Sequence, residues 1–117
     1  MAIITSHTLN GSNGSHAGGI SVYLKNLNSN EIVFQTSMDS GGRLNKTVSS
    51  ESIDENAKYE LVFKTRNYWE KQGKYKNKDR VVEEIVIRFK MPNKNKKYHF
   101  PIILSPNSYS TWWSDGE

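Results

Sequence analysis

Apolar and polar residues alternate along several short segments of the chain, which is the pattern of a half-buried β-strand. Within residues 20–27, the side chains of Ile20, Val22 and Leu24 fall on one face and polar side chains fall on the other. Turn-forming residues bound these segments. On this pattern, strands are predicted over residues 2–9, 20–27, 32–38, 43–48, 59–65, 84–91, 98–104 and 108–114.

The segments between the predicted strands are short, and only one favours a helix. Residues 67–73 suit about two helical turns, with Asn67 as the N-cap and Gly73 as the stop, and residues 74–80 read as a loop. Pro101 has no backbone N–H, so its strand is expected at a sheet edge or with a gap in its ladder. Seven or eight short strands with one small helix predict an all-β sandwich or barrel.

Composition narrows the class of protein further. The 117 residues suffice for one domain, expected over 1–117. Cys is absent, which excludes disulfide scaffolds, Cys-based zinc sites and thiol nucleophiles and is compatible with a reducing cytosol. No apolar run approaches the roughly 20 residues that span a bilayer, and the first ten residues lack the features of a signal peptide. A cytoplasmic protein with no membrane partner is therefore predicted.

The net charge of +4 raises the question of a nucleic-acid partner. Basic residues cluster in 66–80 and 88–97, and the first cluster contains aromatic side chains, as a base-stacking surface would. Acidic residues, among them Glu70, Glu83 and Glu84, dilute that cluster. Solvated loops explain the charge better, so no nucleic-acid partner is predicted.

Three histidines and one turn arginine are the candidate site residues. His7 and His99 lie within predicted strands, His16 lies in a glycine-rich loop where we expect it to be solvated, and Arg43 follows a DSGG turn. A strand histidine is usually structural, and a turn arginine is usually solvated. No HxH or HExxH spacing suggests a metal site, and no GxSxG suggests a serine nucleophile. Spacing alone therefore supports only a small β-sandwich with a His- and Arg-containing surface.

Three segments together resemble a known family. They are SHTLNGSNGSHAGGISVYL (6–24), TSMDSGGRL (36–44) and YHFPIILSPNSYST (98–111). They are similar to the transthyretin family and, within it, to its 5-hydroxyisourate hydrolase branch, and the last segment is the most specific. The resemblance runs from about residue 4 to residue 111. It implies a two-sheet sandwich of about eight strands with one short helix, assembled as a homotetramer that is a dimer of dimers.

The resemblance also implies a site in the channel between two dimers. The family's two histidines and its arginine fall on His7, His99 and Arg43. The hydrolase branch ends in Tyr-Arg-Gly-Ser directly after YST, and this chain departs from that pattern. Thyroid-hormone carriers lack both the tetrapeptide and the His and Arg set. The replaced positions here are Trp112, Trp113, Ser114 and Asp115.

The activity implied is hydrolysis of a ring amide of 5-hydroxyisourate, a purine-derived small molecule, without cofactor or metal. The implied catalytic residues are His7, Arg43 and His99, and the implied substrate-binding residues are His7, Arg43, Trp112 and Trp113. A neutral histidine would take a proton from water, and Arg43 would hold the developing oxyanion.

The sequence leaves three questions open. It does not assign the base between His7 and His99. The replaced terminus allows a transthyretin-like binding protein without turnover, or a diverged enzyme acting on another planar cyclic amide. Trp112 and Trp113 could equally pack an interface between dimers.

Overall fold

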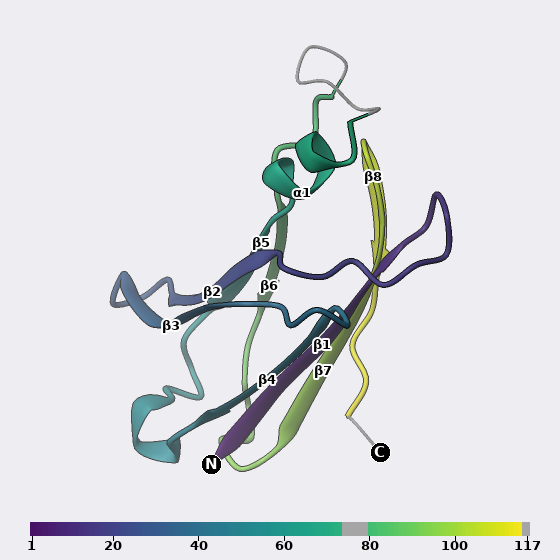
Figure 1. Cartoon of the computed structure of the whole chain (residues 1–117). Coiled ribbons are helices and arrows are strands. Elements are labelled where there is room, and N and C mark those ends of the chain that lie inside the picture. The colour runs from purple at the N-terminus through teal and green to yellow at the C-terminus, as the bar shows by residue number, and fades with distance from the viewer. Residues whose placement is uncertain (74–79, 116–117) are drawn as a thin grey trace.

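The computed structural model describes residues 1–73 and 80–115. Eight strands form two four-stranded sheets, in the orders β4-β1-β7-β8 and β3-β2-β5-β6 (Figure 1). Neighbouring strands pair antiparallel, except that β1 and β7 pair parallel. The predicted two-sheet sandwich is confirmed. The strands are β1 (Ala2–Asn10), β2 (Ser21–Asn26), β3 (Glu31–Ser37), β4 (Arg43–Val48), β5 (Tyr59–Lys64), β6 (Ile85–Phe89), β7 (Lys97–Ser105) and β8 (Ser108–Thr111).

The core lies between the sheets because alternate side chains of each strand point inward. In β1, Ile4 is fully buried, and in β7 Phe100, Ile102 and Leu104 are buried. They pack in one cluster with residues of the other sheet such as Leu61. The odd-numbered side chains of β1 and β7 consequently lie on the outer face of the first sheet. This alternation is what puts both strand histidines outside the core.

Among the described residues, one short helix, α1 (Arg66–Lys71), follows β5, and a single 3-10 turn spans Ser50–Ser52. The helix was predicted, but its N-cap was wrong: Thr65 occupies that position, without a side-chain cap bond, in place of Asn67. Gly73 ends the helix as predicted, with φ of 76°. Residues 74–79 of the predicted loop lie outside the described residues. In the part of the chain that is described, no helix is long and apolar enough to cross a membrane.

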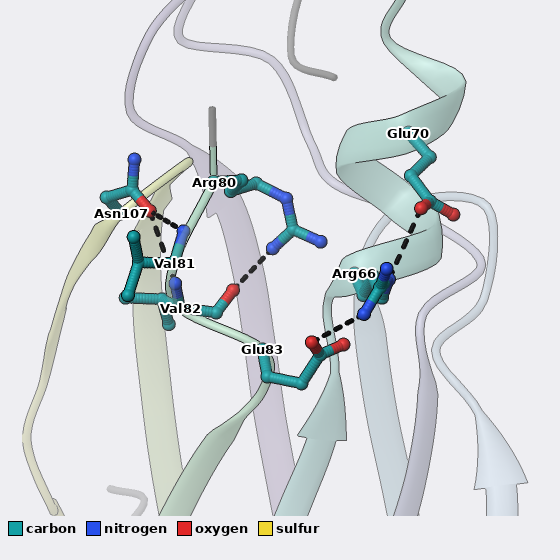
Figure 2. A network of polar contacts seen from close by, with 7 residues as sticks. All are labelled: Arg66, Glu70, Arg80, Val81, Val82, Glu83 and Asn107. Carbon is teal, nitrogen blue, oxygen red and sulfur yellow. Dashed lines mark hydrogen bonds and ion pairs between the residues drawn. The ribbon is translucent and has the colours of Figure 1, made fainter. Parts of the chain in front are cut away.

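Residues 80–83, which lead into β6, are held from two sides (Figure 2). On one side, Arg66 of α1 forms ion pairs with Glu83 at 2.6 Å and with Glu70 at 3.3 Å. On the other side, Asn107 in the turn between β7 and β8 accepts the Val81 N–H at 2.6 Å through Oδ1. Residues 80–83 therefore connect α1 to the β7–β8 turn, and so link the sheet that contains β6 to the sheet that contains β7 and β8.

Pro101 interrupts the ladder between β7 and the chain after β8. The sequence predicted that the strand with Pro101 lies at a sheet edge or has a gap in its hydrogen-bond ladder. Because β7 lies between β1 and β8, it is not an edge strand, and the second alternative applies. His99 and Ser114 exchange two backbone hydrogen bonds, of 2.9 and 3.1 Å. Two residues along, the same register places Pro101 opposite Trp112, where proline has no N–H to donate. Strand β8 accordingly ends at Thr111 and not at the predicted residue 114.

Candidate functional site

The outer face of the β4-β1-β7-β8 sheet brings the three predicted site residues together on adjacent strands. His7 of β1 lies directly opposite Arg43 of β4. Thr5, two residues before His7 and on the same face, lies opposite His99 of β7. Because neighbouring strands are about 4.8 Å apart, Arg43, His7 and His99 form a row across three strands. Far-apart parts of the sequence thus meet on one surface.

The turn before β4 fixes the position of Arg43, the first residue of that strand. Oδ1 of Asp39 accepts the backbone N–H groups of Gly41 and Arg43, both at 2.9 Å. Gly42 has φ of 74°, and a Cβ there would lie 2.5 Å from the carbonyl oxygen of Thr8. Only glycine fits this position, because a side chain would suffer both the strained backbone and the close contact. The DSGG sequence therefore folds the turn tightly against β1 and delivers Arg43 beside His7.

His99 is anchored through one ring nitrogen. Its Nδ1 lies 2.8 Å from Oγ1 of Thr5, and its backbone is bridged to Ser114. Burial, and then the positive charges of Lys97 and Arg43, lower the pKa of His99 below that of free histidine, against a raising contribution from the Thr5 carbonyl. The Thr5 carbonyl can only accept and the Thr5 hydroxyl can accept as well, so we assign the proton of the neutral ring to Nδ1. Nε2 of the neutral ring then carries the lone pair.

A pocket of about 310 Å³ lies between Arg43 and His99. Its polar lining includes Thr5 and Asn45, and its charged lining residues are Arg43, Lys97 and Asp39. The volume is at the small end for a ligand site. Two cations, an amide and an imidazole suit a small polar ligand rich in carbonyl groups. His7 is not among the residues that line this pocket, although it lies beside Arg43.

His7 contacts His16, the histidine that we expected to be solvated. Its Nε2 lies 2.9 Å from Nδ1 of His16, and the two rings stack with centroids 4.9 Å apart. His16 is exposed, as expected, but it is held against His7 and not simply solvated. Burial first, then Arg43, His16 and His99, lower the pKa of His7, whereas the Gly41 carbonyl raises it. His7 is therefore neutral at neutral pH.

The two terminal tryptophans go to different places. Trp113 lines a separate apolar pocket of about 230 Å³ with Tyr98, Phe100 and Phe89, and the Nζ atom of Lys96 lies 5.3 Å from its ring centroid. The structure does not bring Trp113 to the pocket between Arg43 and His99. Trp112 lies at the level of Pro101 in the register and is half exposed. Of the predicted pair, only Trp112 is left near the His and Arg row.

Within residues 1–73 and 80–115, no three His, Cys, Asp or Glu side chains are grouped so that they could hold a metal ion. The donors gathered on the outer face are two strand histidines, His16, one arginine and one lysine. They offer hydrogen bonds and positive charge, which suit proton transfer and the binding of carbonyl oxygens.

A two-sheet sandwich of eight strands with one short helix is the architecture that the sequence resemblance implied. The model of the HIUase/Transthyretin family matches residues 4–113, so the chain belongs to this family. The resemblance stated from the sequence is thereby confirmed.

Individual relatives and solved structures agree with the family. The chain is 27% identical over 114 residues to a 5-hydroxyisourate hydrolase of Pseudomonas aeruginosa, covering 96% of this chain and 90% of the relative. It is 29% identical over 112 residues to that of Halalkalibacterium halodurans, covering 93% and 94%. Sea bream transthyretin in complex with thyroxine superposes with a TM-score of 0.82 at 19% identity, covering 97% of this chain and 96% of that chain. That likeness shows the fold alone.

Proposed function

We propose that the chain is an enzyme that hydrolyses 5-hydroxyisourate, a step of purine breakdown. The relatives with the same overall length are hydrolases of that name. The fold is shared with a thyroxine-binding transthyretin, so the fold does not distinguish enzyme from carrier. The observation that carries the proposal is the pocket between Arg43 and His99, because a cationic fork facing a neutral imidazole is suited to opening a polar cyclic amide.

In the proposed reaction, Arg43 binds a carbonyl oxygen of the substrate with its planar donors. His99 is the base, because Nδ1 is engaged by Thr5 and the lone pair on Nε2 is directed away from that contact. Nε2 takes a proton from water as the water oxygen bonds to the carbonyl carbon. Arg43 stabilises the resulting oxyanion. The ring C–N bond then breaks, and the proton on His99 passes to the leaving nitrogen.

His7 has a supporting role in this scheme. It lies opposite Arg43, and its lowered pKa keeps it neutral beside that cation. A neutral His7 adds no positive charge next to Arg43 and leaves the Arg43 guanidinium free to bind the oxyanion. Trp112, at the edge of the row, supplies a planar face for the substrate ring.

A binding protein without turnover is the second candidate, and the replaced terminus favours it. Trp112 and Trp113 stand where the hydrolase branch has Tyr and Arg, and a half-exposed Trp112 can hold a planar ligand without chemistry. The two candidates separate when binding and turnover are measured together. An enzyme quenches tryptophan fluorescence with the ligand and accelerates loss of 5-hydroxyisourate, whereas a binding module shows quenching alone.

We also propose a homotetramer of single-domain chains in the cytoplasm, with the site in the channel between dimers. The support is the outer face itself, where Ile103 and Trp112 are 40% and 50% exposed close to the His and Arg row. Such side chains are typical of interfaces between subunits. Light scattering should give four times the mass of one chain. If the measured mass is that of one chain at all concentrations, the tetramer and its channel are wrong, and the outer face is exposed to solvent.

A further inference from the structure

His16 belongs to a short segment that continues the sheet where β4 stops. The N–H of Ala17 donates to the Thr8 carbonyl at 2.9 Å, and the N–H of Asn10 donates to the Ser15 carbonyl at 2.8 Å. These two bonds place His16 opposite Leu9 in an antiparallel bridge. Leu9 and His7 are two residues apart on the same face of β1. His16 therefore stands on the outer face next to His7, along the same edge of β1 that pairs with β4.

Buried contacts fix this segment and prevent His16 from moving as a free loop residue. Oγ1 of Thr8 donates to the Ala17 carbonyl at 2.6 Å, and both residues are fully buried. A Cβ at Gly18 would lie 2.6 Å from the carbonyl oxygen of Ser40, so the segment packs directly on the turn that carries Arg43. The same turn thus supports both neighbours of His7.

The protons of the His7 and His16 pair can be assigned. At 2.9 Å between Nε2 of His7 and Nδ1 of His16, one nitrogen donates and the other accepts. The Gly41 carbonyl interacts with the His7 ring and can only accept, and Nε2 is taken by His16, so we assign the His7 proton to Nδ1. The remaining arrangement has Nδ1–H of His16 donating to Nε2 of His7.

We propose that His16 is a positioning residue of the site: by donating to Nε2 of His7 it holds His7 as the neutral Nδ1–H tautomer beside Arg43. With both nitrogens of His7 occupied, His7 has no lone pair for water, so of the two strand histidines it is His99 that can act as the base. This consequence for hydrolysis rests on the proposed function, but the His16–His7 interaction itself does not.

The charged and titratable groups around His7 come from each element packed against it. Arg43 faces it from β4, His99 from β7 and His16 from the segment after β1. The Asp39 carboxylate is engaged by backbone N–H groups of the turn. Three of these neighbours disfavour a charged His7, and only the Gly41 carbonyl favours it. Loss of His16 removes one neighbour that disfavours the charge and the donor to Nε2, and both losses raise the pKa of His7.

The test is an NMR titration of ¹⁵N-labelled histidine side chains, which needs no substrate. Wild-type protein should show His7 as the Nδ1–H tautomer. The variants His16→Ala and His16→Phe should shift His7 toward the Nε2–H tautomer and raise its pKa, and the second variant keeps a stacked ring. His16→Asn should preserve the Nδ1–H tautomer, because its amide N–H can donate in place of Nδ1–H. Ser12→Ala, in the same connection, is the matched control and should change nothing.

Two results would overturn the proposal: a wild-type His7 that carries its proton on Nε2, or a His7 tautomer and pKa unchanged in both His16→Ala and His16→Phe. If the chain hydrolyses 5-hydroxyisourate, the acidic limb of kcat/KM should also move to higher pH in His16→Ala and return in His16→Asn. Absence of hydrolysis by the wild-type chain would end the proposed function while leaving the NMR result to decide the role of His16.

Discussion

Thr5 and His99 lie opposite each other in the parallel β1–β7 pair, and the Thr5 hydroxyl is 2.8 Å from Nδ1 of the imidazole. This contact crosses 94 residues of sequence, and it sets which nitrogen of His99 faces the pocket. A strand pairing thereby determines the orientation of the proposed base. Positioning a base through its other nitrogen is a common feature of acid–base sites.

The Thr5 contact predicts the effect of removing the hydroxyl. Thr5→Val keeps the shape of the side chain and removes the hydroxyl contact to His99, while the Thr5 backbone carbonyl remains. A hydrogen bond of this kind contributes about 1 kcal/mol, so kcat/KM for 5-hydroxyisourate should fall roughly fivefold. Thr5→Ser should restore most of it. An unchanged kcat/KM in Thr5→Val would show that the hydroxyl does not orient the base.

The pH dependence follows from the lowered pKa of His7 and His99. Both imidazoles must be neutral in the proposed reaction, and a lowered pKa means that the neutral form persists to lower pH. The value of kcat/KM should therefore be level at neutral pH and fall only below the usual histidine pKa of about 6.5. A profile whose acidic midpoint lies above that of free histidine would contradict a neutral His pair.

Arg43 is predicted to stabilise the transition state. Arg43→Ala removes the donor that faces the oxyanion, and such a loss costs about 10²- to 10³-fold in kcat. Arg88→Ala is the matched control, because Arg88 is an exposed arginine of the other sheet whose partner is Glu60 at 2.8 Å. In steady-state assays, kcat of Arg43→Ala should be lower than kcat of Arg88→Ala by this factor of about 10² to 10³. Equal rates would mean that Arg43 does not touch the reacting carbonyl.

The two terminal tryptophans should respond differently to ligand. Trp112 lies near the row, whereas Trp113 lines the apolar pocket with Phe89 and Phe100 and Trp69 is 1% exposed. Urate, a stable planar purine, should quench intrinsic fluorescence saturably in the wild type, in Trp113→Phe and in Trp69→Phe. The signal should be lost in Trp112→Phe. Loss of quenching in Trp113→Phe instead would place the ligand at the other pocket.

Much of the fold follows from the sequence because strand alternation is a local property. The same parity that predicts residues 20–27 as a strand also puts His7 and His99 on outer faces. The DSGG turn could be read locally too, since Asp39 binds N–H groups of its own turn, although the close contact of Gly42 with Thr8 could not. The order of the strands and the parallel pairing of β1 with β7 are not local, and only the structure gave them.

The features of the site that the sequence did not predict depend on contacts between residues that are far apart in the sequence. His16 lies in a Gly-, Asn- and Ser-rich segment without periodicity, and its contact with His7 depends on the bonds of that segment to β1. The separate position of Trp113 depends on the pairing of residues after β8 with β7, which puts Trp113 opposite the buried Phe100. Strand alternation predicts that Thr5 lies on the same face as His7. Its contact with His99 could not be predicted, because it depends on the register between β1 and β7.

The most direct measurement follows the absorbance of freshly generated 5-hydroxyisourate, with the spontaneous rate subtracted, for the wild type and His99→Ala at equal concentration. Circular dichroism and light scattering should first show that both proteins have the same fold and mass. Hydrolysis at the outer face predicts a decay accelerated in proportion to wild-type enzyme and reduced about 10²- to 10⁴-fold, the contribution of a general base, in His99→Ala. A wild-type decay equal to the spontaneous rate, or an equal acceleration by both proteins, would contradict it.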